Sequence, residues 1–128
     1  MIFKEERLRD EFYTLPAMLQ VMAVHFEQLC IAYYKKDPVV TRVLEKVEGS
    51  SGVHEAGRGI DFRYAHGSET FVSEHDAQFL VSEMNRKFPR TDSKKCMILH
   101  SFGGGPMHFH LQLQAGHEGD EADCYVVT

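Results

Sequence analysis

The sequence predicts an α+β domain with a small, mainly antiparallel sheet and two main helices. Amphipathic helical segments and short β-branched runs follow one another along the 128-residue chain in the order helix, strand, strand, helix, strand, strand. The glycine-rich turn at residues 103–106 is too short for a parallel crossover, so it favours antiparallel neighbours. The length fits one domain over residues 1–128.

The N-terminal part predicts a short polar helix or arm at residues 3–13, followed by a longer helix. Pro16 suits the first turn of that helix, where its missing N–H costs nothing. Lys35 and Lys36 suit its C-terminal end, and Asp37-Pro38 stops it. Apolar residues recur at spacings of three and four between these points, namely Leu15, Leu19, Met22, Phe26, Leu29 and Tyr33.

The rest of the chain predicts strands around a second helix. The β-branched run 39–47 indicates one strand, and residues 60–64 indicate another after a glycine-rich loop. Ser73 resembles the N-cap of a helix that ends at Phe88-Pro89. Residues 96–102 and 107–114 predict two further strands, and residues 124–127 indicate an edge strand.

Composition limits the classes of function. Charged residues make up 26% and hydrophobic residues 43%, as in an ordinary soluble globular protein. The net charge of -5 argues against a nucleic-acid partner, and the apolar stretches are too short to span a bilayer. The three cysteines (Cys30, Cys96 and Cys124) lack tight spacing, which predicts buried reduced thiols and no zinc site built from thiolates. The charged N-terminus does not resemble a signal peptide, so we expect synthesis in the cytoplasm.

Two histidines share one face of the strand predicted at residues 107–114. Side chains alternate along a strand, so His108 and His110 point the same way, together with Gln112 and Gln114. The opposite face is predicted to pack in the core through Met107, Phe109, Leu111 and Leu113. The polar face suits one metal ligand beside one group that transfers protons. An exposed sheet face that carries histidines incidentally is the alternative.

His54 and Asp61 are a second candidate pair. They are seven residues apart with glycines between them, so the loop can fold back and bring both to one ion. Zinc binds imidazole nitrogen and carboxylate oxygen, and three protein ligands with an open fourth position are typical of catalytic zinc. His54, Asp61 and His110 would supply such a set. For residues 54–61 taken alone, a polar, glycine-rich loop without a metal is an equally good explanation.

These two segments resemble the zinc D-Ala-D-Ala carboxypeptidases and related peptidoglycan endopeptidases. HEAGRGID at residues 54–61 is similar to their HxxGxAxD signature, and HFHL at residues 108–111 is similar to their HxH strand. The resemblance covers about residues 39–114 and implies the small α+β fold that the family shares with the Hedgehog signalling domain. It implies that Zn²⁺ is held by His54, Asp61 and His110, and that His108 lies beside the metal as the catalytic residue. Arg42 is a candidate for holding substrate.

His100 precedes the glycine-rich turn on the neighbouring strand and is a further candidate for contact with substrate. Glu55 is a rival base, although as a loop residue it is interpreted first as solvated, and Arg63 is interpreted as a solvated charge. Three positions depart from the family pattern. Gly59 replaces a usual Ala, Gly52 replaces a usual Ser or Thr, and Met107 stands where many members have a general-base Glu.

Three functions remain open at this point. The first is zinc-dependent hydrolysis of a peptide bond in bacterial cell-wall peptidoglycan by a carboxypeptidase or endopeptidase, with a phage origin as one option. Its partners would be peptidoglycan stem peptides or other small peptides, and neither a nucleic acid nor a membrane is expected as a partner. Another factor would release the protein to the cell wall. The second is a catalytically inactive zinc-binding domain of the same fold that acts as a binding or structural module. The third is a protein without a metal.

Overall fold

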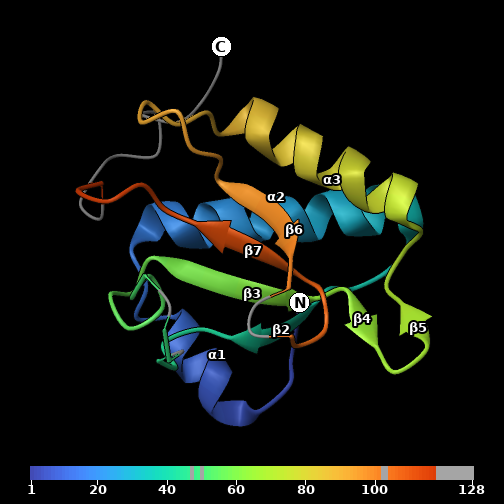
Figure 1. The fold of residues 1–128 in the computed structure, drawn as a ribbon, viewed down its shortest axis with the longest axis horizontal. Helices are drawn as coiled ribbons and strands as arrows, with labels where there is room; N and C mark the ends of the chain where they lie inside the picture. Colours follow the sequence, from blue (N-terminus) through green and yellow to red (C-terminus); the bar gives the residue numbers. More distant parts are fainter. Residues whose placement is uncertain (47, 50, 102–103, 118–128) are drawn as a thin grey trace.

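A five-stranded sheet forms the centre of the molecule in a computed structural model, which describes residues 1–46, 48–49, 51–101 and 104–117. The order of the strands is β1 (Ile2–Phe3), β2 (Val39–Arg42), β3 (Gly59–Arg63), β7 (His108–Gln112) and β6 (Met97–His100). Only β1 and β2 are parallel, and the other neighbours are antiparallel. The predicted α+β class and the mainly antiparallel sheet are therefore confirmed (Figure 1).

Three helices accompany the sheet within the described residues: α1 (Glu6–Phe12), α2 (Ala17–Tyr34) and α3 (Glu74–Lys87). Helix α2 runs behind the sheet in the view of Figure 1 and packs against it through aromatic rings. The ring of Phe26 lies 4.7 Å from that of Phe62 on β3 and 5.2 Å from that of Phe109 on β7. The core therefore fills one face of the sheet and leaves the opposite face of β3 and β7 for other side chains.

The limits of the two longer helices agree with the sequence. Helix α2 ends where Lys35 adopts a left-handed conformation with φ 55°, and the Lys35 N–H donates to carbonyls of the last turn. Helix α3 begins at its predicted cap, because the Ser73 Oγ accepts a hydrogen bond of 3.1 Å from the backbone N–H of Asp76. The predicted apolar stripe of α2 is buried at Leu19, Met22 and Phe26, which are all at 0% exposure. The prediction was wrong for Tyr33 near the end of the helix, which is 60% exposed.

Three predicted strands are shorter in the structure: β2, β6, which was predicted over residues 96–102, and β7, which was predicted over residues 107–114. Strand β2 ends at Arg42, short of residue 47, because the next backbone groups bind side chains in place of a neighbouring strand. The Val43 carbonyl is 2.8 Å from the His54 Nδ1, and the Leu44 N–H donates to the Glu11 carboxylate at 3.1 Å. Met107 is 39% exposed and does not join the core, because β7 begins one residue later.

Other features went unpredicted or lie outside the description. The sequence did not indicate β1, nor the hairpin of β4 (Ala65–His66) and β5 (Glu69–Thr70). Residues 47, 102 and 124–127, which the strand predictions included, are outside the described residues. Cys30 and Cys96 are buried and free, as predicted. A search of the described helices found none with the length and apolar character that a membrane span needs.

Candidate metal centre

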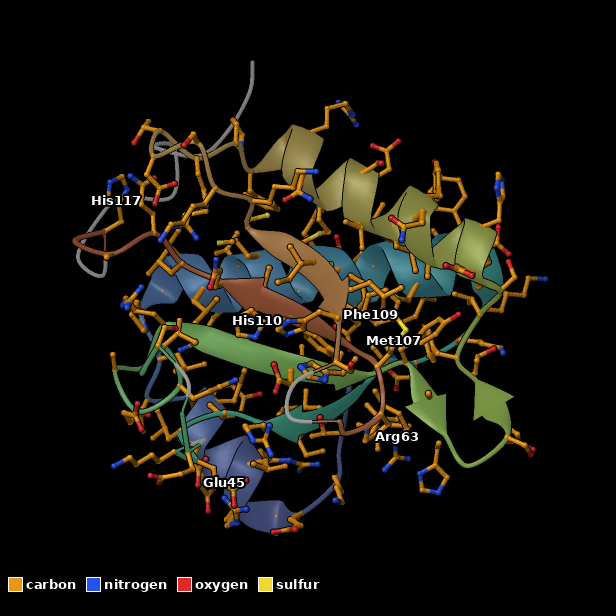
Figure 2. The ribbon with its side chains drawn as sticks, in the orientation of Figure 1. Glu45, Arg63, Met107, Phe109, His110 and His117 are labelled. Carbon is orange, nitrogen blue, oxygen red and sulfur yellow. The ribbon has the colours of Figure 1, made fainter. Side chains whose placement is uncertain are left out.

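The centre is built on the register between β3 and β7. Asp61 pairs directly with His110 across this antiparallel ladder, and Phe62 pairs with Phe109. Because side chains alternate between the faces of a sheet, the two phenylalanines enter the core, and Asp61 and His110 share the opposite face. Figure 2 shows His110 in the middle of β7. Strand pairing alone therefore brings a carboxylate and an imidazole together.

His54 reaches the same place from the loop before β3. Backbone hydrogen bonds close this loop, from Gly57 N–H to the His54 carbonyl at 2.9 Å and from Arg58 N–H to the Val53 carbonyl at 2.9 Å. Gly57 supports the turn with a φ of 73°. Gly59 lies so close that a Cβ there would be 3.2 Å from the His110 ring and 3.4 Å from that of His54. The absence of a side chain at residue 59 thus lets both rings approach β3.

The three predicted ligands are buried and close together. Their exposed fractions are 4% for His54, 2% for Asp61 and 6% for His110. The His54 Nε2 is 3.2 Å from Asp61 Oδ2, and the His110 Nδ1 is 2.7 Å from Asp61 Oδ1. One ligand atom from each residue lies within 4.8 Å of the other two, so these residues lie close enough to hold a metal ion.

The outer nitrogen of each ligand imidazole has a hydrogen-bond acceptor. The Val43 carbonyl accepts from the His54 Nδ1 at 2.8 Å, which leaves the Nε2 as the ring nitrogen that faces Asp61 and would be available to a cation. The side-chain amide of Gln112 donates to the Lys95 carbonyl at 3.3 Å, and this fixes its orientation. Its Oε1 then accepts from the His110 Nε2 at 3.2 Å, so the His110 Nδ1 is the inward ring nitrogen. This atom donates to Asp61 Oδ1 at 2.7 Å, and its lone pair would become available to a cation that displaced the proton.

This arrangement of donors fits a bound cation. One ring nitrogen from each of two imidazoles and one carboxylate point at one region, and the partners of the outer nitrogens hold the rings in that orientation. Such outer partners are the usual companions of histidines that ligate metals, and two imidazoles with one carboxylate form a donor set that zinc accepts. The residues present therefore fit the metal that the sequence motif implies.

Asp61 remains ionised in spite of its burial. Burial alone would raise the pKa of this carboxyl, but hydrogen bonding to His110 and His54 holds the pKa well below its usual range. The Arg42 guanidinium donates to Asp61 Oδ2 at 3.3 Å, and the His108 Nε2 lies 3.6 Å from the same oxygen. The carboxylate is thus the electrostatic centre of the site.

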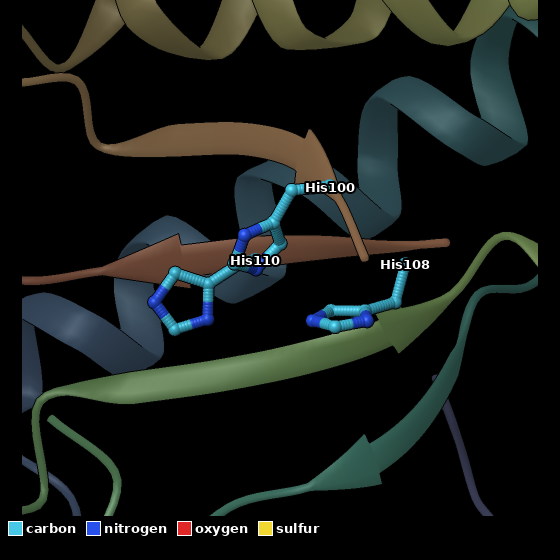
Figure 3. Close-up of side chains that lie close together, drawn as sticks. All are labelled: His100, His108 and His110. Atoms are coloured by element: carbon cyan, nitrogen blue, oxygen red, sulfur yellow. The ribbon is translucent and has the colours of Figure 1, made fainter. Parts of the chain in front are cut away.

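His108 and His100 extend the imidazole cluster beyond the three ligands. The two residues pair across β6 and β7, and their ring centroids are 4.7 Å apart (Figure 3). The His108 Nδ1 donates to the Pro106 carbonyl at 3.3 Å, so its Nε2 is the acceptor atom that faces Asp61. Burial and the nearby His108 and His110 lower the pKa of His100, which favours a neutral ring.

A second group with metal-ligand spacing consists of His100, His108 and His110. It shares His110 with the first group, but it contains no carboxylate, and two of its members are only half-buried. The first group offers a negative charge to a cation and a fixed orientation for both of its imidazoles. The first group, His54, Asp61 and His110, is therefore the better candidate for holding a cation.

All six residues predicted for the site meet around one cavity of about 290 Å³: Arg42, His54, Asp61, His100, His108 and His110. Arg42 is half-buried and also donates to the Glu45 carboxylate at 3.3 Å. Glu55 is exposed and does not line this cavity, so the structure gives no support to its role as a rival base.

Sequence reasoning missed the residues that orient the ligands. Strand alternation had placed Gln112 on the same face of β7 as His110, but the sequence indicated no role for it in orienting that ring. The Val43 carbonyl has no signal in the sequence, because any residue offers a carbonyl and only the loop closure brings this one to His54.

Comparisons of the chain with protein-family models, with curated proteins and with solved structures found no match.

Proposed function

We propose that this protein is a zinc-dependent peptidase that hydrolyses a peptide bond in bacterial cell-wall peptidoglycan. One observation carries the proposal: two oriented imidazole nitrogens and an ionised carboxylate converge beside a cavity that also contains a third imidazole, that of His108. Three ligands next to an open cavity are typical of catalytic zinc, whereas structural zinc is closed by four. The resemblance of residues 54–61 and 108–111 to the zinc carboxypeptidases supports peptidoglycan as the substrate class.

Each residue has a role that follows from its position. Zinc held by His54, Asp61 and His110 would supply Lewis acidity for the attack of water on a peptide carbonyl. The Nε2 of His108 points at the centre with its lone pair, so it is placed to accept a proton from the attacking water. His100 lies beside His108 with a lowered pKa, so a neutral ring is available to hydrogen-bond substrate.

Hydrolysis is tested with untagged, zinc-reconstituted protein and purified muropeptides, followed by mass spectrometry. We expect products that gain one water, that disappear with a chelator and that return when zinc is restored. His54→Ala should lose both zinc and products, whereas His75→Ala, on the exposed surface of α3, should keep both. Zinc content far below one equivalent after reconstitution would count against a metal function of any kind.

An inactive zinc-binding module of the same fold is the second candidate. Met107 favours it, because this position lacks a carboxylate that could act as a base. His108→Ala separates the two candidates. A peptidase should lose most of its turnover and keep its zinc, because His108 is not one of the proposed ligands. Intact zinc binding without cleavage of any muropeptide by the unmodified protein would favour the module.

A further inference from the structure

A second cavity of about 440 Å³ adjoins the metal centre. It shares Arg42, Asp61 and His108 with the first cavity, so the two meet at the centre. From there the second cavity extends past the end of β3 to the N-terminal segment and to His66 of the β4–β5 hairpin. An extended ligand that crosses the centre would therefore place one part in each cavity.

The two cavities differ in charge. Apart from the shared Arg42, the lining of the first contains neither Lys nor Arg, and it includes the apolar Val53 and Ile98. The second is lined by four basic residues, namely Lys4, Arg7, Arg42 and Arg63. Its glutamates are already paired, since Glu5 contacts Arg7 at 2.9 Å and Glu45 contacts Arg42 at 3.3 Å. Among the residues that the structure describes, positive charge without an acidic partner therefore remains at this end of the site.

Arg63 is the main part of that charge. It follows Asp61 by two residues on β3, so its side chain leaves the sheet on the face of the metal centre, and it pairs in register with His108. Figure 2 shows it at the end of β3 beside the hairpin. The residue is half-buried, and its guanidinium has no ion pair or hydrogen bond to any residue that the structure describes. A partly desolvated guanidinium of this kind is well suited to an anionic ligand.

We propose that Arg63 binds a carboxylate of the substrate and so selects peptides with an acidic group on one side of the cleaved bond. The planar guanidinium matches the two oxygens of a carboxylate, and Lys4 adds a positive charge to the same cavity. Both an acidic side chain and a free C-terminus offer this group. The inference rests on the proposed function only for the statement that the ligand is a peptide.

Equilibrium binding tests the inference without any need for turnover. Zinc-reconstituted, ¹⁵N-labelled protein is titrated with two matched pairs of acetylated tripeptides and followed by NMR. One pair is trialanine as the free acid and as the amide, and the other is Ala-Glu-Ala amide and Ala-Gln-Ala amide. We expect the acid of one pair to bind roughly tenfold more tightly than its neutral partner, as for a hydrogen bond to a charged group. The preferred pair identifies the source of the carboxylate.

Arg63→Gln should abolish this preference and leave the affinity for the neutral peptide unchanged, whereas Arg63→Lys should keep part of it. The control is Arg86→Gln, because Arg86 lies on α3, outside both cavities. Equal affinities within both pairs, or no binding of any peptide, overturn the proposal. A preference that persists in Arg63→Gln also overturns it and indicates that the carboxylate binds the zinc. A preference for the acidic peptides without cleavage of muropeptides would support the role of Arg63 and count against hydrolysis. Cleavage of muropeptides without this preference would support hydrolysis and count against the role of Arg63.

Discussion

Gln112 should control the zinc affinity of the centre although it touches no metal. Its amide is held by the Lys95 carbonyl, and its Oε1 accepts from the outer nitrogen of His110 at 3.2 Å. Gln112→Met keeps the length of the side chain and removes the acceptor. The His110 ring then loses the contact that fixes its tautomer and orientation, and part of its population no longer directs a lone pair at the metal.

The expected loss is about tenfold in zinc affinity, or about 1.4 kcal/mol, which is the lower end of the range for partners that orient ligands. The lower end applies because Gln112 is only half-buried, so water can replace part of the lost hydrogen bond. The assay is competition for zinc with a chromophoric chelator at fixed pH. The ¹⁵N chemical shifts of the His110 ring report the tautomer in the same samples.

Gln78→Met is the matched control, because Gln78 is exposed on α3 and does not contact the centre. Its zinc affinity should equal that of the unmodified protein. If Gln112→Met also binds zinc with unchanged affinity, the role assigned to this amide is wrong. An unchanged His110 tautomer in the variant would show in addition that the ring is oriented by other contacts.

Three further predictions address the packing of the protein. Gly59→Ala places a Cβ 3.2 Å from the His110 ring, so we expect urea denaturation to show a loss of about 1 kcal/mol, with weaker zinc binding. Unchanged stability and affinity would show that the rings have room to move. Phe26→Ala opens the core between α2 and the sheet and should cost about 3–5 kcal/mol in the free energy of unfolding, whereas a loss below 1 kcal/mol would contradict the packing described. Burial raises the pKa of the Cys30 and Cys96 thiols to about 12, so both should stay protonated and react with a thiol reagent at pH 8 only after denaturation. Mass mapping of the labelled cysteines in the native protein checks this, and rapid labelling of either residue would refute it.

The sequence identified the proposed ligands because strand geometry and loop chemistry both act over short distances. His108 and His110 share a face by simple alternation, and the glycines after His54 allowed the loop to return toward Asp61. That these two segments meet was expected from the motif resemblance, and the register of β3 with β7 provides the meeting point. Strand alternation also places Arg63 on this face, but only the tertiary structure shows that its guanidinium lacks an acidic partner within the described part of the chain.

The failures concern features that local patterns do not encode. The β-branched run at residues 39–47 predicted a long strand, but β2 ends at Arg42, and the next carbonyl, that of Val43, accepts a hydrogen bond from the His54 ring. Strand β1 and the β4–β5 hairpin consist of two-residue strands, which are too short for a hydrophobic period to register. Met107 was assigned to the core by extending the alternation one residue beyond the end of the ladder.

The direct pairing of Asp61 with His110 ties metal chemistry to the alignment of two strands. Formation of the sheet places the Asp61 carboxylate and the His110 imidazole next to each other. The conformational entropy lost in positioning these two groups is therefore lost during folding and not during metal binding. A slip of one residue between β3 and β7 would turn one of the two donors toward the hydrophobic face and break the chelate. With the proposed zinc site, metal uptake would serve as a sensitive reporter of correct strand alignment in this protein, even in variants whose overall helix content is normal.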